Sequence, residues 1–154
     1  MTGPAGAVTG GQVGGIAPHR SKVVAALLAA LLGGVCAHWW YIGRPKAWLA
    51  TAVSGALIVL SRLYPVWWDN TPFLLLSIPL TAGYIDALVI CLRTDEQFDA
   101  RYNPHSGQQT KTRLTPILIA LAVTLFGFGI VVLFITLIVM HVYTAMGWLD
   151  GYVF

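Results

Sequence analysis

Four apolar runs, separated by charged or turn-forming segments, dominate the pattern of this chain. The first, residues 23–42, has twenty residues and as a helix could cross about 30 Å of hydrocarbon. The second, residues 47–61, is short for a full crossing, so it either tilts or re-enters. The third, residues 73–92, contains Pro79 and is expected to kink there. The fourth, residues 114–144, is long enough to tilt or to project from the bilayer.

The composition is that of a membrane protein. Of the 154 residues, 57% are hydrophobic and 10% are charged, whereas a soluble domain has about 25% charged residues. The net charge of +3 is small and scattered, which argues against a nucleic-acid-binding surface. We therefore predict an all-α integral membrane protein: a compact helical hairpin domain of three membrane segments, followed by one long C-terminal transmembrane helix.

The chain divides by composition into five parts. Residues 1–19 hold six glycines in their first fifteen positions and are expected to be a disordered tail. Residues 20–104 would form the membrane domain, 105–113 a flexible polar loop and 114–146 the C-terminal transmembrane helix. Residues 147–154 would be a short tail.

Small residues predict close helix packing. The candidates for helix contacts are Ala26, Ala30, Gly34, Gly43 and Gly83. Ala26, Ala30 and Gly34 are spaced four apart, in line with His38, and such a ridge lets helix backbones approach closely in lipid. This order favours a retained helix over a cleaved signal peptide, which residues 20–37 also resemble.

Charged and aromatic residues mark the expected membrane edges. The aromatic anchors would be Trp39, Trp40, Trp67 and Trp68. If all four runs cross, six of the nine basic residues share one side. That side holds Arg44, Lys46, Arg93, Arg101, Lys111 and Arg113. The excess favours a cytoplasmic location for it, with both termini outside, but the scheme inverts if residues 47–61 only re-enter.

The segment after the third run predicts a short amphipathic helix. Thr94 and Gln97 have the spacing of a capping box. Phe98 and Tyr102, four apart, are expected to form an aromatic edge on the bilayer surface. The acidic residues Asp95, Glu96 and Asp99 fit a solvated helix start better than a metal site.

Polar residues inside the apolar runs are the candidate site. They are His38, Tyr41, Arg44 and Asp86. A charged acid in a membrane helix costs about 3 kcal/mol, so Asp86 is expected to pair with His38 or Arg44. The pair would fasten the first segment to the third. Alternatively, it would form part of a proton or ion relay.

Several short motifs resemble the TM-two domain family, named for its pair of transmembrane helices. The opening motif comprises Ser21-Lys22, residues 25–29, Leu32-Gly33, Ala37-His38 and Tyr41-Ile42-Gly43-Arg44. Gly83-Tyr84-Ile85-Asp86 is similar to the end of the domain. Residues 95–103 are similar to the tail that follows it in bacterial members. The resemblance covers about residues 20–104.

The resemblance implies a membrane-embedded domain with His38, Gly43 and Asp86 at its structural centre. It implies no activity, because bacterial members have none that is settled. Trp39 and Trp40 also stand where the family commonly has arginine and phenylalanine. The signalling motif of some animal members is therefore absent, and the fourth run is an addition to the family pattern.

These observations predict a small scaffold or interaction subunit, multi-pass, in a bacterial inner membrane. Its partners would be the lipid bilayer and other membrane helices, from its own copies or from other proteins, and not nucleic acid. The alternative is a minimal proton- or ion-coupled transporter or channel component that uses His38 and Asp86. No catalytic motif, zinc-ligand spacing or cofactor motif is present in the sequence, so we expect neither an enzyme, a metal site nor a cofactor.

Overall fold

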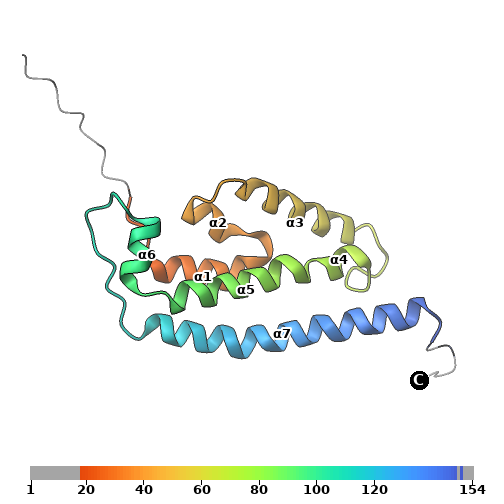
Figure 1. The fold of residues 1–154 in the computed structure, drawn as a ribbon. Helices are drawn as coiled ribbons and strands as arrows, with labels where there is room; N and C mark the ends of the chain where they lie inside the picture. Colours follow the sequence, from red (N-terminus) through yellow and green to blue (C-terminus); the bar gives the residue numbers. More distant parts are fainter. Residues whose placement is uncertain (1–17, 149, 151–154) are drawn as a thin grey trace, which may run out of the picture.

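A computed structural model describes residues 18–148 and 150 of the chain, and this part is helical (Figure 1). The elements in order are α1 (Lys22–Leu32), the 3₁₀ turn η1 (Gly33–Val35), α2 (Ala37–Ile42), α3 (Ala47–Ser61), α4 (Thr71–Leu75), α5 (Ser77–Leu92), α6 (Asp95–Tyr102) and α7 (Thr115–Ala145). The expected tails lie largely outside the described residues. The predicted all-α class is confirmed.

The first apolar run is two short helices instead of one long one. After α1 the chain passes through η1, and Cys36 adopts a left-handed conformation with φ 57° and ψ 29°. Helix α2 then returns beside α1, so residues 22–42 form a helical hairpin (Figure 1). The prediction of a single crossing by residues 23–42 is wrong. The ridge that was to run from Ala26 through Gly34 to His38 is broken at the same turn.

Two features explain this reversal. The Gly33-Gly34 pair has low helix propensity. Gly33 also packs directly on Gly83 of α5: a Cβ added at Gly33 would lie 2.7 Å from the Cα of Gly83. Such an approach needs glycine on both segments, because a Cβ on either one would collide with the other backbone. Gly34 lies beside α5 as well, 3.5 Å from the Leu80 side chain when a Cβ is added.

A side chain of α3 offers a hydrogen-bond donor to the backbone at this reversal. The hydroxyl of Thr51 lies 3.1 Å from the carbonyl oxygen of Val35, the last residue of η1. The same hydroxyl accepts a hydrogen bond of 2.9 Å from the indole Nε1 of Trp40. Because lipid offers no hydrogen bonds to an interrupted helix, this partner makes the turn tolerable within an apolar environment.

The later elements agree better with the sequence. Helices α3 and α7 begin and end within one residue of the predicted runs 47–61 and 114–144. The third run is interrupted at Leu76, between α4 and α5, three residues before Pro79. A proline obstructs helix continuation in the turn before it, which accounts for the interruption. Within the described residues, two helical stretches are long and apolar enough to cross a membrane: Thr71–Leu92 and Thr115–Ala145.

The longer helices lie side by side, parallel or antiparallel to one another, so most connections lie at two ends of the molecule. The first end contains the start of α1, and the second end contains the end of α3. Helices α1, α3 and α7 run one way, and α2 and α5 run the other (Figure 1). His19 Nδ1 lies 3.1 Å from Ser106 Oγ at the first end. His141 Nδ1 lies 2.8 Å from Asp69 Oδ1 at the second. The four-crossing scheme separates Ser21 from Ser106, and the structure contradicts it by placing both at the first end.

This arrangement also changes the distribution of charge. Eight of the nine basic residues lie at the first end, and Arg62 alone lies at the second. Those at the first end are Arg20, Lys22, Arg44, Lys46, Arg93, Arg101, Lys111 and Arg113. The division of six against three expected from four crossings is therefore wrong, because the hairpin returns Arg20 and Lys22 to the same end as the others.

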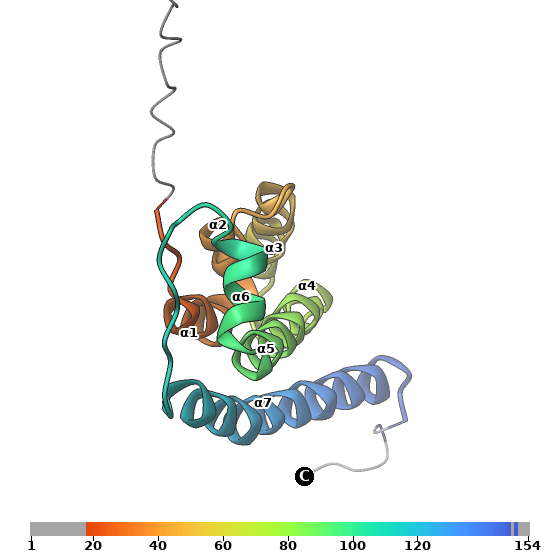
Figure 2. The same ribbon diagram turned by 60° about the vertical axis from the view of Figure 1, so that its left-hand side comes forward.

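The core lies where α1, α5 and α7 meet, and the turned view shows these three helices side by side (Figure 2). Ala25, Ala26 and Ala29 of α1 are fully buried against this contact, while Ala30 is only half-buried. Small side chains therefore do line the helix contact of α1, although in a shorter helix than predicted.

Gly43 has a role other than the predicted helix packing. It ends α2 with φ +72°, a conformation that favours glycine. A Cβ added there would lie 2.7 Å from a guanidinium nitrogen of Arg20. Gly43 therefore makes the turn that leads to Arg44.

Candidate functional site

The carboxylate of Asp86 is the centre of a polar site between α5 and α2. Its Oδ2 atom lies 2.9 Å from His38 Nε2. The indole Nε1 of Trp39 donates a second hydrogen bond of 2.9 Å to the same oxygen. The guanidinium of Arg44 donates a third, at 3.3 Å. The expected partners of Asp86, His38 and Arg44, are thus both in contact with it.

Local structure brings these three donors together. Helix α2 is six residues long and carries His38 and Trp39 in its first turn. The left-handed Gly43 then turns the chain so that Arg44 reaches back, with its guanidinium carbon 4.9 Å from the centre of the Trp39 ring. His38 is 1% exposed, whereas the Asp86 side chain is 22% exposed. The His38 side of the site is thus buried, whereas the Asp86 carboxylate is partly exposed.

Chemically, this arrangement stabilises an ionised carboxylate. Three N–H donors on one oxygen offset the cost of removing a charge from water, which an unpartnered acid could not avoid. Because two donors come from the hairpin, the third from Arg44 in the turn that follows it, and the acceptor from α5, the Asp86 site joins the hairpin to α5.

One of the predicted site residues lies elsewhere, and one contributor to the site was missed. The hydroxyl of Tyr41 accepts a hydrogen bond from the backbone N–H of Ser21 at 2.8 Å, so Tyr41 stabilises the start of α1 and not Asp86. Trp39 was expected at the membrane interface, but it is half-buried and binds Asp86. Its position directly after His38, with an indole N–H, is the signal that could have identified it.

The other predicted anchors are exposed. Trp40, Trp67 and Trp68 are all solvent- or lipid-accessible. Trp67 packs edge-on against Phe73, with ring centres 5.5 Å apart, at the second end of the molecule. Exposure alone does not test whether these tryptophans lie at a membrane edge, so that role stays a prediction.

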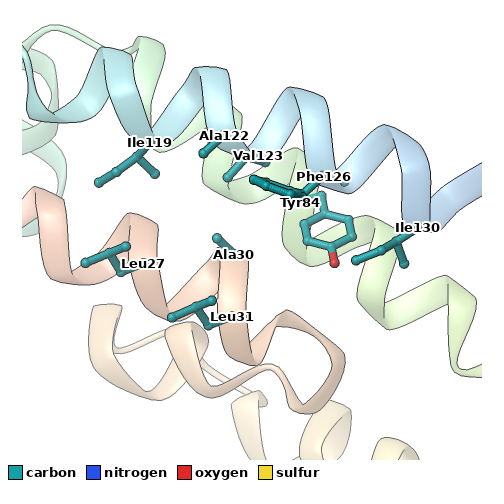
Figure 3. Close-up of a pocket in the computed structure, with 10 residues that line it drawn as sticks. Leu27, Ala30, Leu31, Tyr84, Ile119, Ala122, Val123, Phe126 and Ile130 are labelled. Atoms are coloured by element: carbon teal, nitrogen blue, oxygen red, sulfur yellow. The ribbon is translucent and has the colours of Figure 1, made fainter.

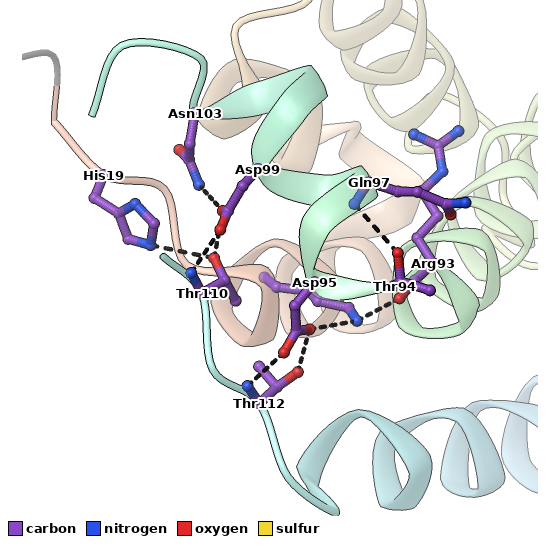
Figure 4. A network of polar contacts seen from close by, with 10 residues as sticks. His19, Arg93, Thr94, Asp95, Gln97, Asp99, Asn103, Thr110 and Thr112 are labelled. Atoms are coloured by element: carbon purple, nitrogen blue, oxygen red, sulfur yellow. Dashed lines mark hydrogen bonds and ion pairs between the residues drawn. The ribbon is translucent and has the colours of Figure 1, made fainter. Parts of the chain in front are cut away.

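A second polar cluster, here the α6 network, joins α6 to α1 and to the segment before α7 (Figure 4). Lys22 is almost fully buried and lies 3.0 Å from Asp95 Oδ1. The backbone N–H of Thr112 donates to the other Asp95 oxygen at 2.7 Å. Thr110 donates to Asp99 in the same way. Residues 105–113 were predicted as a flexible loop, but these contacts fasten its second half to α6.

Other expectations for this helix are partly confirmed. The Thr94 side chain accepts the N–H of Gln97 at 3.2 Å, as the capping motif predicts. Phe98 is 0% exposed and belongs to the core, so its placement on the bilayer surface is wrong. Asp95 and Asp99 are bound within the α6 network and are not simply solvated, while Glu96 is exposed. Helix α6 therefore caps one end of the bundle.

Hydrogen bonding holds the pKa of two acids in the α6 network below its usual value. Partial burial alone would raise the pKa of Asp95, but hydrogen bonds from Thr112 and the nearby Lys22 outweigh that effect. For Asp99, burial is likewise outweighed by Thr110 and Asn103. The folded state therefore favours both ionised carboxylates.

The lowered pKa values of Asp95 and Asp99 predict that the attachment of residues 105–113 to α6 weakens at acidic pH. The stabilisation from Asp95 and Asp99 is present at and above the unfolded carboxyl pKa of about 4. It is lost as pH falls below that value through the lowered pKa of the folded state. The amide hydrogens of Thr110 and Thr112, which donate to Asp99 and Asp95, should be less protected from exchange with deuterium at pH 2.5 than at pH 4.5, after correction for the intrinsic exchange rate at each pH. The Asp95→Asn/Asp99→Asn variant should show little protection at either pH; equal protection of these amides in the two proteins would contradict the assignment.

Within the described residues, no group of three His, Cys, Asp or Glu side chains is arranged to hold a metal ion. Cys36 and Cys91 are both buried and free. The polar chemistry of this part of the chain is concentrated in the Asp86 site and the α6 network.

Comparisons with known proteins identify the family. No family model matches the chain, and no solved structure matches it. The chain is 30% identical over 90 residues to the uncharacterized membrane protein YozV of Bacillus subtilis (strain 168), a match that covers 58% of this chain and 90% of that protein. Nearly the whole length of the relative is thus represented here. The chain belongs to the same family as the uncharacterized membrane protein YozV, and it is an all-helical membrane protein.

Proposed function

We propose that this protein is a small multi-pass scaffold or interaction subunit of a bacterial inner membrane, which packs against other membrane helices. The observation that carries the proposal is the exposure of α7. This helix has 31 residues, of which Pro116, Val123 and Gly127 are buried in the protein. A helix that serves only as an anchor needs about 20 residues. Helix α7 therefore offers a long apolar face to lipid or to a partner.

The Asp86 site supports a structural role over transport. All three neighbouring donors are engaged by one carboxylate oxygen, which fits a permanent fastening of the hairpin to α5. One observation favours the alternative, a proton- or ion-coupled transporter or channel component: His38 Nδ1 and Ser54 Oγ are buried and have no hydrogen-bond partner in the described part. Under the scaffold proposal, Asp86→Asn lowers protein abundance; under the alternative, it abolishes proton-coupled flux at unchanged abundance.

We also infer membership in the TM-two domain family. The residues that the resemblance places at the centre of the domain support it, since His38 and Asp86 are in contact and Gly43 makes the turn beside them. The fourth predicted run, now α7, is an addition to that pattern.

For the membrane arrangement, we infer that the α1–α2 hairpin re-enters on one side and that α3, α4–α5 and α7 cross. Interrupted helices are tolerated at membrane depth where protein covers them, as Thr51 covers the turn at Val35. The end with eight of the nine basic residues is then cytoplasmic, by the excess of Lys and Arg in cytoplasmic segments.

Cysteine labelling tests this topology. Single cysteines at Pro18, Tyr64 and Glu96, all exposed, are introduced into the chain with Cys36 and Cys91 replaced by alanine. A membrane-impermeant thiol reagent should label Tyr64→Cys in intact cells, and Pro18→Cys and Glu96→Cys only after permeabilisation. Labelling of Pro18→Cys together with Tyr64→Cys would instead support four crossings.

Photocrosslinking in native membranes tests the scaffold role. Leu121 and Phe128 are exposed and seven residues apart, so they share one face of α7. A photoreactive residue at either position should give the same discrete adduct with one other membrane protein. The buried Val123 is the matched control and should give none. Adducts between two copies of this chain alone would favour the alternative, an oligomeric conduit, and the absence of any protein adduct at either position would contradict the scaffold.

A further inference from the structure

An apolar groove of about 260 Å³ runs between α1 and α7, with α5 as its floor. Figure 3 shows its walls: Leu27, Ala30 and Leu31 on α1, and Ile119, Ala122 and Phe126 on α7. Small side chains on both helices, Ala30 and Ala122, leave the space open. Nearly all of the lining is apolar, so the groove suits a hydrocarbon chain better than a polar ligand.

Basic residues lie at one end of this groove. Lys22 of α1 and Thr112 bind the same Asp95 carboxylate, which holds the segment before α7 against the start of α1. Lys111 and Arg113, on either side of Thr112, are exposed, and the ion pairs among the described residues do not include them.

The spacing matches a lipid molecule. Ile119, the first groove residue of α7, follows the start of the helix at Thr115 by four positions, which is about 6 Å of helix. Lys111 and Arg113 lie just before that start, so a phosphate bound by them would lie more than about one helical turn from the first groove residue, off the N-terminal end of α7. Basic pockets beside membrane helices, at the positively charged side of the protein, are suited to anionic headgroups.

We propose that the α1–α7 groove is a binding site for an anionic phospholipid. One acyl chain occupies the groove, and Lys111 and Arg113 bind the phosphate of the headgroup. The choice of a lipid over a second copy of the chain rests on charge. Both helices that wall the groove begin at the end that holds eight of the nine basic residues, and a second copy placed in the same orientation would bring like charge to that end.

Native mass spectrometry of the full chain tests the proposal. The protein is released from detergent in the presence of dioleoyl phosphatidylglycerol or of phosphatidylcholine with the same chains. The wild type should retain phosphatidylglycerol about 25-fold more strongly, at roughly fivefold for each basic side chain. Lys111→Gln/Arg113→Gln should reduce this preference to near unity, whereas Arg62→Gln, at the opposite end, should leave it unchanged.

A second variant tests the groove itself. Ala122→Trp fills it from α7 and should lower retention of both lipids at least tenfold, whereas Leu118→Trp, on an exposed face outside the groove, should not. Equal retention of the two lipids by the wild type would overturn the proposal. So would a preference for phosphatidylglycerol that survives Lys111→Gln/Arg113→Gln. A dimer that dissociates on Ala122→Trp, without a change in lipid retention, would assign the groove to a second copy of the chain.

Discussion

Replacing Asp86 with alanine is expected to lower the free energy of unfolding by about 3 kcal/mol or more. Among the described residues, Asp86 is the acceptor that His38, Trp39 and Arg44 share, so the change deprives three N–H donors of their partner at once. His38 is buried and cannot turn to water in exchange. Unfolding of the purified protein in mixed micelles with increasing SDS, followed by tryptophan fluorescence, measures the effect.

A matched exposed pair provides the control. Asp69 and His141 lie 2.8 Å apart, but both side chains are substantially exposed. Asp69→Ala should therefore cost less than about 1 kcal/mol. Trp39→Phe keeps an aromatic ring and removes one donor, so it should cost about 1 kcal/mol. If Asp86→Ala were no more costly than Asp69→Ala, the Asp86 site would not fasten the hairpin to α5.

Gly83→Ala is expected to be the most damaging single-methyl substitution, at about 2–3 kcal/mol. A Cβ at this position would overlap the Cα of Gly33 and lie 2.9 Å from the carbonyl oxygen of Ala29. Both neighbours are backbone, so neither can move aside without shifting the whole α1–η1 segment. The same SDS titration measures the loss, and Gly33→Ala should show a similar one.

Two other helical glycines separate this steric effect from helix propensity. Gly55 in α3 and Gly129 in α7 have nothing within 4 Å of an added Cβ. Alanine at either position should stabilise the protein by up to about 1 kcal/mol, because alanine is the better helix former. Stabilisation by Gly83→Ala as well would mean that α5 and the hairpin do not meet closely at this point.

The cause of the chain reversal after α1 cannot be read from the hydropathy pattern. An apolar run of this length is compatible with a continuous helix and with a hairpin, so the pattern of residues 23–42 does not distinguish between them. What decides between them is a set of contacts with distant residues, Gly83 and Thr51. Glycines that allow a close helix crossing also weaken the helix that contains them, and the sequence prediction took account only of the close crossing.

The sequence by itself determined the membrane class, the extents of α3 and α7, the Thr94 cap and the need of Asp86 for a partner on the first segment. Each of these depends on transfer energy or on contacts a few residues apart, which are readable along the chain. The tertiary structure alone decided the α1–α2 hairpin, the use of Trp39 at Asp86, the attachment of residues 110–112 to α6 and the gathering of eight basic residues at one end. These depend on backbone proximity between segments dozens of residues apart, and a one-dimensional pattern of apolar and polar positions carries no information about it.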